Sequence, residues 1–482
     1  MDASMSKTKI VHIFITLVLM FGIGFIPPFS QMTVLGMKIL GVLVGAIYGI
    51  TFFSPVWACL LAMAAFPILG IAPVTQVLST GLGSDSIMLM LFFFVFVAVL
   101  EQNHVTEFMA NWIISRKALA GRPWLFSYTL IVGTMLTGAF GSSFPAMMVF
   151  WAILISTCKM YDIKPFTKYP TVMFMGICIG GLASSSTWLF RGNPLFVNAT
   201  LQAVSGGAYA LNFGMYALFS FLMWMIAIAG YILACKYLLK VDVGPLADIS
   251  DSLVDQESLK LTKRQKITMI YAVLVIAVYC FIGFTPASSS LGQYLATFGT
   301  TTPIVILLVC MAVTFIDGTP LLEFGKAAKN GVMWDTLILA GTLLTLATLM
   351  MTLDTGIAAS LIALLSPVFA GRGVIFLTVI VFIVSVILTN FMANTTVGLM
   401  FTPVIVSFAA TMGFNPLPVI AIMLIGIHIA FITPAASPFA AMLFGYTEWV
   451  KPTDIYKYGA LTCLIMVVVF LVVGIPLSTA MM

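Results

Sequence analysis

The sequence predicts an all-α polytopic membrane protein built from two related halves. Of its 482 residues, 61% are hydrophobic and only 8% are charged, and the mean hydropathy is +1.15. A soluble chain of this length needs far more charge on its surface. Apolar runs of membrane-spanning length recur along the chain, and small or polar residues interrupt several of them at matching places in the two halves.

Apolar runs define the expected helices, in chain order. They occupy residues 10–26, 34–53, 57–71, 89–100, 124–140, 216–239, 267–284, 303–315, 374–388 and 461–475. Because about twenty residues cross the hydrocarbon core, the longer runs qualify as spans and the shorter ones as half-spans or re-entrant helical hairpins, about eleven spans in total. The first run ends at Pro27 and Pro28 rather than at a small-residue cleavage site, so we expect a retained first helix.

One sustained polar segment, residues 240–266, separates the two halves. Arg264 and its neighbouring lysines, like Lys7 and Lys9 near the N-terminus, follow the positive-inside pattern, so we expect a cytoplasmic linker and a cytoplasmic N-terminus in an inner or plasma membrane. The predicted units are a first repeat at 1–239 (scaffold helices at 10–72, transport elements at 84–200), the linker at 240–266, and a second repeat at 267–482 (transport elements at 333–445).

The net charge and the cysteines exclude other classes of protein. The charge of +5 is spread over loops without a dense basic patch, so no nucleic-acid partner is expected. The seven cysteines form no CxxC pair and predict neither a disulfide framework nor a metal site. The expected partners are the lipid bilayer and a small anionic substrate.

The two halves match at a spacing of about 250 residues. Asp85 and Asp335, 250 residues apart, each open an apolar run and are expected to cap helices. Two further pairs of segments correspond: 141–143 with 394–396, and 180–184 with 429–433. Duplicated halves with apolar segments broken at matching positions are typical of secondary transporters with inverted repeats.

Four interruptions form the predicted binding site, at residues 138–145, 184–194, 389–396 and 433–438. Glycine and proline break helices and free backbone groups there. The N-termini of half-helices favour an oxyanion, whereas freed carbonyls and hydroxyls suit a hard cation such as sodium. A single Ser or Thr in a membrane helix usually bonds its own backbone or a neighbouring helix, but four clusters in register favour a site for an anion and a cation.

Two single residues near these interruptions allow more than one interpretation. Arg191 would clamp a carboxylate with two hydrogen bonds or, alternatively, reach the membrane interface as an ordinary snorkelling side chain. His428 is expected on an apolar helix as a packed, hydrogen-bonded residue rather than as a ligand or proton relay. The first-half candidates for substrate binding are Ser142, Ser143, Arg191, Gly192, Asn193 and Pro194.

Residues 393–403, ANTTVGLMFTP, carry a specific resemblance. They resemble the Ser-Asn-Thr signature of the divalent anion/sodium symporter (DASS) family, within the wider ion-transporter superfamily. Residues 430–440, AFITPAASPFA, look like the second-repeat tip of that family. The two repeats and the polar linker follow in the same order over essentially the whole chain.

The resemblance implies roles for individual residues. Asn394 and Thr395 would contact a carboxylate, with Ser437 and Pro438 from the opposing tip. Sodium would bind among Thr389, Ala393, Asn394 and Ala436, and a second ion among Gly141, Ser142 and Ser184. The family transports by an elevator mechanism, in which a mobile domain carrying both tips slides against a scaffold that also forms a homodimer contact.

The chain departs from the family pattern in its first repeat. Gly141 stands opposite Asn394, so the amide is absent there, and neither tip has the expected Pro-Asn ending. Fewer coupled sodium ions, coupling to another ion, or plain exchange are therefore all open. We expect Asn394→Ala to be far more damaging than replacement of Gly141 by another small residue.

Rival functions lack their sequence features. A channel would show rings of like charge or repeated filter segments, and an enzyme would show HExxH, GxSxG or paired acids. A cation antiporter would place a carboxylate deep in the core, but the four interruptions contain no Asp or Glu. The predicted function is a carrier of organic dicarboxylates or similar divalent anions, sodium-coupled or exchanging; a sulfate-like anion, or a cation or metalloid, are the alternative substrates.

Overall fold

The computed structural model describes residues 7–190, 192–247, 260–285, 289–350, 353–357, 359–360, 363–364, 372–434 and 436–482. In these ranges the protein is nearly all helical, with one short hairpin of strands β1 (Phe315–Ile316) and β2 (Thr319–Pro320). Nine described helices are long and apolar enough to span a membrane, or ten if α15 (Phe324–Gly331) and α16 (Trp334–Met350), bent by 74°, form one span. The predicted all-helical polytopic fold is confirmed.

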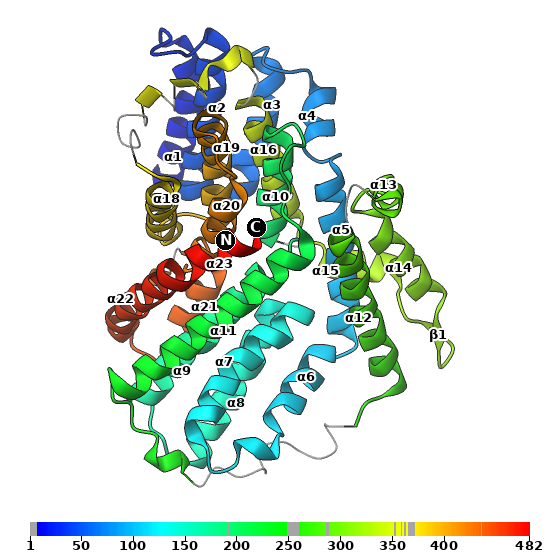
Figure 1. Cartoon of the computed structure of the whole chain (residues 1–482), viewed down its shortest axis with the longest axis vertical. Coiled ribbons are helices and arrows are strands. Elements are labelled where there is room, and N and C mark those ends of the chain that lie inside the picture. The colour runs from blue at the N-terminus through cyan, green and yellow to red at the C-terminus, as the bar shows by residue number, and fades with distance from the viewer. Residues whose placement is uncertain are drawn as a thin grey trace.

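Figure 1 shows helices α1 to α4 at one end of the molecule and α6 to α9 at the other, with α5 leading from one group to the other. The first half consists of α1 (Lys7–Leu17), α2 (Val34–Phe52), α3 (Pro55–Ile68), α4 (Val74–Thr80), α5 (Asp85–Gln102), α6 (Val105–Ile114), α7 (Pro123–Phe140), α8 (Ser143–Met160), α9 (Lys168–Ser186), α10 (Gly192–Val204) and α11 (Phe213–Tyr237).

The second half begins within the predicted linker, of which residues 248–259 lie outside the described part of the chain. Besides α15 and α16 it consists of α12 (Lys263–Phe284), α13 (Ser290–Ala296), α14 (Thr302–Val313), α18 (Val374–Thr389), α19 (Asn394–Met412), α20 (Leu417–Gly426), α21 (Pro438–Gly445), α22 (Pro452–Val469) and α23 (Ile475–Met481).

Local chemistry explains where several of these helices begin. Thr262 forms a capping box with Gln265 at the start of α12, and the Asn212 side chain accepts hydrogen bonds from the first backbone N–H groups of α11. Asp85 does not cap the helix that it opens, because Ser84 is the N-cap of α5 and its hydroxyl accepts from the Ile87 backbone N–H. The Asp85 carboxylate instead accepts hydrogen bonds from the backbone N–H groups of Thr300 and Thr301, just before α14.

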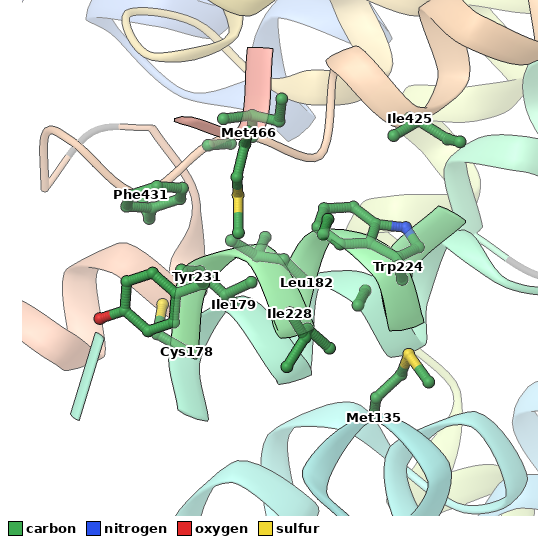
Figure 2. Close-up of a cluster of buried hydrophobic side chains, with 14 of the residues drawn as sticks. Met135, Cys178, Ile179, Leu182, Trp224, Ile228, Tyr231, Ile425, Phe431 and Met466 are labelled. Carbon is green, nitrogen blue, oxygen red and sulfur yellow. The ribbon is translucent and has the colours of Figure 1, made fainter. Parts of the chain in front are cut away.

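Two buried apolar clusters hold the helices together. The first joins α7 to α9 with α11 and with α18 to α22, and Figure 2 shows its centre, where Trp224 and Tyr231 of α11 lie near Leu182, Phe431 and Met466. The second joins α2, α3, α5, α14 and α16. The helices that flank the four interruptions lie mostly in the first cluster, while α5 and α16 belong to the second.

The two halves also make reciprocal close contacts. A Cβ atom on Gly81, just after α4, would lie 2.8 Å from the carbonyl oxygen of Gly341 on α16. A Cβ atom on Gly331, at the end of α15, would lie 2.4 Å from Cβ of Ala98 on α5. Gly81 and Gly331 are 250 residues apart. Glycine is required at both places because the neighbouring helix leaves no room for a side chain.

Candidate functional site

All four predicted interruptions break helices. The chain leaves helical structure between α7 and α8, between α9 and α10, between α18 and α19, and between α20 and α21. The first three breaks lie within the predicted segments but are shorter: α7 ends at Phe140 and α8 begins at Ser143, α9 ends at Ser186 and α10 begins at Gly192, and α18 ends at Thr389 and α19 begins at Asn394. The fourth, which we expected to begin at Thr433, already begins at Ile427 and runs to Ser437.

The longer fourth break corrects the position of His428, which lies just beyond the end of α20 instead of on a helix. The cause is Asn390, at the end of α18. Its side-chain nitrogen donates to the Ile429 carbonyl at 2.8 Å, and its side-chain oxygen accepts from the Ile432 backbone N–H at 3.0 Å. These bonds satisfy backbone groups that would otherwise require a continued helix.

His428 is nevertheless packed and hydrogen-bonded, as predicted. It is 1% exposed, and its Nδ1 lies 2.7 Å from the Leu424 carbonyl. Since Nδ1 must carry the proton to donate there, Nε2 has a free lone pair. That lone pair accepts from the side-chain amide of Asn193, 3.2 Å away.

Asn193 joins the two halves of the molecule at the centre of the site. Its side-chain oxygen accepts a hydrogen bond from the Thr395 hydroxyl, while its amide nitrogen donates to His428. The resulting chain of hydrogen bonds runs from α19 through α10 to the end of α20. The structure therefore brings together two predicted substrate-binding residues, Asn193 and Thr395, and adds His428 as their partner.

An oxygen-rich corner lies at the start of α19. The Thr389 hydroxyl is 2.9 Å from the Asn394 side-chain oxygen and 2.7 Å from the Ile427 carbonyl. A hydroxyl has only one proton, so it cannot donate to both oxygens. Hydroxyl, amide and carbonyl oxygens at one point form a donor set that suits sodium. The other predicted ligands lie at the same breaks, with Ala436 buried and Ala393 partly buried.

Ser437 and Pro438 begin α21. The Ser437 hydroxyl accepts from the backbone N–H of Ala440 at 3.1 Å and donates to the Ala430 carbonyl at 2.7 Å. Ser437 therefore acts as the N-cap of α21 and fixes the direction of this half-helix. Its contact with substrate stays a prediction.

The break between α7 and α8, which we call the first tip, differs from the corner at Thr389 and Asn394. The hydroxyls of Ser143 and Ser184 are 2.7 Å apart, and a Cβ atom on Gly138 would lie 2.6 Å from Ser184 Oγ. Next to them, a Cβ atom on Gly141 would lie 2.5 Å from the hydroxyl of Thr106 on α6. Thr106 thus fills the space in which a side chain at position 141 would stand.

Sequence reasoning missed Thr106, since a threonine on an amphipathic helix carries no motif. Its hydroxyl and that of Thr137 are buried and have no hydrogen-bond partner among the described residues. Buried unpaired hydroxyls are costly, so two such groups around the first tip suit a cation or another polar occupant. This is the neighbourhood of the predicted second sodium position at Gly141, Ser142 and Ser184.

A cavity of about 160 Å³ opens beside the first tip. Its lining combines small or polar residues with larger apolar ones. The small or polar residues are Ser142, Ser143, Ser185 and Gly192, and the apolar ones are Met90, Phe93, Phe94, Val97, Phe144, Met333 and Phe439. Phe144 and Phe439 stack with ring centroids 4.2 Å apart and so connect the tips of the two halves.

The corresponding place in the second half is closed. Between α16 and the start of α19 the free space is only about 20 Å³, lined by residues that include Ala347, Thr396 and Leu399. Ala347 lies 250 residues after Val97, which lines the large cavity. Free space therefore separates α5 from the first tip, whereas α16 packs closely against the start of α19, which we call the second tip.

Three further predicted site residues are close together in the sequence, at positions 191, 192 and 194. Arg191 lies outside the described residues, although Gly192, which follows it, begins α10 with a φ of +62°. Such a left-handed conformation favours glycine. Pro194 is buried within the first turn of α10, where proline fits because its missing N–H is not needed.

These helices and paired breaks define a multi-pass, nearly all-helical membrane protein, and a solved structure has a similar fold. The crystal structure of the Alcanivorax borkumensis YdaH transporter, described as having an unusual topology, is similar with a TM-score of 0.61 over 88% of this chain and 97% of that one, at 12% sequence identity. The chain belongs to the citrate transporter family (CitMHS), whose profile matches residues 39–426.

A curated relative carries a similar description. An uncharacterized transporter of Haemophilus influenzae is 25% identical over 222 residues, which amount to 45% of this chain and 46% of that protein. The match thus spans about half the length of the relative. The family and the fold indicate an integral membrane transporter of the ion-transporter superfamily rather than an enzyme, and they leave the closer likeness to DASS carriers unconfirmed.

Proposed function

We propose that the protein is a secondary active transporter of organic carboxylate anions, dicarboxylates among them, coupled to sodium or operating by exchange. The observation that carries this proposal is the meeting of the two halves at Asn193 and Thr395, where broken helices α10 and α19 join through side chains. Membership of the citrate transporter family supports a carboxylate as cargo.

Binding of the anion relies on helix starts and hydroxyls. The first residues of α8 and α10 line the cavity beside the first tip, together with Ser142, Ser143 and Ser185. Free N–H groups and the partial positive charge at such helix starts attract an oxyanion. We also propose Arg191, which precedes Gly192 in the sequence, as a residue that would clamp a carboxylate with two hydrogen bonds.

The coupling ion binds at the corner of Thr389 and Asn394. All three oxygens described there are neutral, as expected for a weakly held sodium ion that must be released in each cycle. A second ion at Gly141, Ser142 and Ser184 would use the unpaired hydroxyls of Thr106 and Thr137. Bound sodium would then stabilise the conformation of both tips in which the substrate binds.

Alternating access proceeds by an elevator-like movement of the tips against α5 and α16. Two features support this step: the reciprocal contacts of Gly81 and Gly331 fit inverted repeats, and one tip contact is open while its counterpart is packed. In a transporter with two related halves, such a difference is expected when the substrate site is open to one side of the membrane only. By the same likeness we propose a homodimer in the inner or plasma membrane with a cytoplasmic N-terminus.

Transport in proteoliposomes tests the proposal. Purified protein is reconstituted with an internal carboxylate, and entry of the labelled carboxylate is followed with and without an inward sodium gradient. Accumulation that requires sodium supports symport, and sodium-independent counterflow supports exchange. If no carboxylate enters in either condition while the reconstituted protein is folded and oriented, the proposed function is wrong.

A further inference from the structure

The lining of the cavity beside the first tip is too apolar for a fully hydrophilic substrate. Seven of its lining residues are Met, Phe or Val, and they come from α5, α8, α21 and the bend before α16. Citrate and other compact polycarboxylates carry oxygens on half or more of their carbons. Pressing such a molecule against phenylalanine rings would strip water from groups that find no hydrogen-bond partner there.

The size of the cavity matches one ring. Its volume is about 160 Å³, and an engineered protein cavity of about 150 Å³ lined by Leu, Ile and Phe binds benzene. Phe93 and Phe94 present aromatic side chains from α5, and Phe144 stacks on Phe439 at the other side. Aromatic rings pack favourably against one another at such distances.

The polar residues of the lining fit a carboxylate. Ser142 and Ser143 stand where α8 begins, and Gly192 stands where α10 begins, so two helix starts open on the same space. A molecule with its carboxylate at these helix starts would place the rest of its body against the phenylalanines. The lining therefore offers both polar and apolar groups to one molecule.

We infer that the transported anion is a carboxylate whose body is apolar and about the size of one ring, with its carboxylate held at the starts of α8 and α10. This inference rests on the proposed function and narrows its substrate class. It also separates this chain from a carrier of citrate, because the wall of Phe93, Phe94 and Phe144 selects for the apolar body.

Counterflow in proteoliposomes decides between the substrate classes. Benzoate and phthalate are compared with succinate and citrate at equal low concentrations, with the same internal anion. We expect the two ring carboxylates to exchange at least about tenfold faster, the ratio that burial of an apolar body of this size provides. Equal rates, or exchange of succinate or citrate alone, would overturn the inference and leave the proposed function standing. Failure of all four anions would remove both.

Variants of α5 test whether the cavity lining determines the preference for ring carboxylates. Phe94→Ser, or Val97→Ser one turn further, removes part of the apolar wall and should reduce the preference for benzoate over succinate about tenfold. Phe92→Ser is the matched control, because Phe92 is a partly buried phenylalanine of the same helix that does not line the cavity. An unchanged preference in both wall variants, with normal thermal stability, would contradict the assignment.

Discussion

The hydroxyl of Thr106 lies 2.5 Å from the point where a Cβ atom on Gly141 would stand. Gly141 occupies the position at which the second half has Asn394, so the first tip lacks an amide and instead has a hydroxyl supplied by α6. The sequence indicates that the first tip has lost an amide at this position. The structure shows that the Thr106 hydroxyl occupies the place of the missing side chain. Replacement of Gly141 by another small residue should therefore have a cost of its own, and its comparison with Asn394→Ala stays a prediction.

Gly141→Ala should destabilise the protein and impair transport. The new methyl group would meet Thr106 Oγ1 at 2.5 Å and the Thr137 carbonyl at 3.1 Å, and overpacking of this kind costs about 1–3 kcal/mol. Thermal unfolding of the purified protein and carboxylate counterflow measure the two effects. The double variant Gly141→Ala with Thr106→Ala should recover most of the stability, since it removes the closest atom. A fully stable single variant would show that the tip rearranges freely.

The positions of the helix breaks could be predicted from the sequence because their causes are local. Glycine, proline and short polar side chains within apolar runs weaken a helix wherever they cluster. The early end of α20 could not be predicted in this way. It depends on Asn390, a residue of another helix, whose amide bonds Ile429 and Ile432.

The residues of the site also divide into those that the sequence alone could predict and those that it could not. Asn193 and Thr395 were among the predicted residues because amides and hydroxyls are conspicuous in an apolar chain. Phe93 and Phe94 were not, since this sequence has 39 phenylalanines, most of which pack or face lipid. Only the three-dimensional arrangement shows which of them line a cavity. Thr106 was missed for a related reason: its contact with Gly141 joins helices that share no sequence pattern.

Asn390→Ala should destabilise the fourth break more than a typical surface substitution. It removes bonds to the Val386 and Ile429 carbonyls and to the Ile432 backbone N–H, which are left in a mostly buried segment. We expect a loss of about 2–4 kcal/mol from these unpaired groups, measured by denaturant or thermal unfolding. Asn330→Ala, at an exposed position, is the control and should change stability little. Similar losses in both variants would contradict the role given to Asn390.

Asn193 and His428 should be energetically coupled in transport. Asn193→Ala leaves the Thr395 hydroxyl and His428 Nε2 without the partner they share, and we expect carboxylate uptake to fall about tenfold or more. In a double-mutant cycle with His428→Ala, the two changes should be non-additive by about 1 kcal/mol. Gln202→Ala, at an exposed position of α10, is the matched control. Additive effects would show that the hydrogen bond between Asn193 and His428 has no part in positioning the site.

Thr389 should set the sodium dependence of transport. Thr389→Val keeps the shape of the side chain but removes the oxygen that lies near Asn394 Oδ1 and the Ile427 carbonyl. We expect the half-saturating sodium concentration to rise about tenfold or more, and Thr389→Ser to restore it, because the hydroxyl returns. Thr378→Val is the control on the same helix, since among the described residues the Thr378 hydroxyl bonds only the Val374 carbonyl one turn earlier. Uptake measured against sodium concentration distinguishes a lost ion ligand, which shifts the half-saturation point, from a packing defect, which lowers the maximal rate without moving that point. Thr389→Val with an unshifted sodium dependence would place the ion elsewhere.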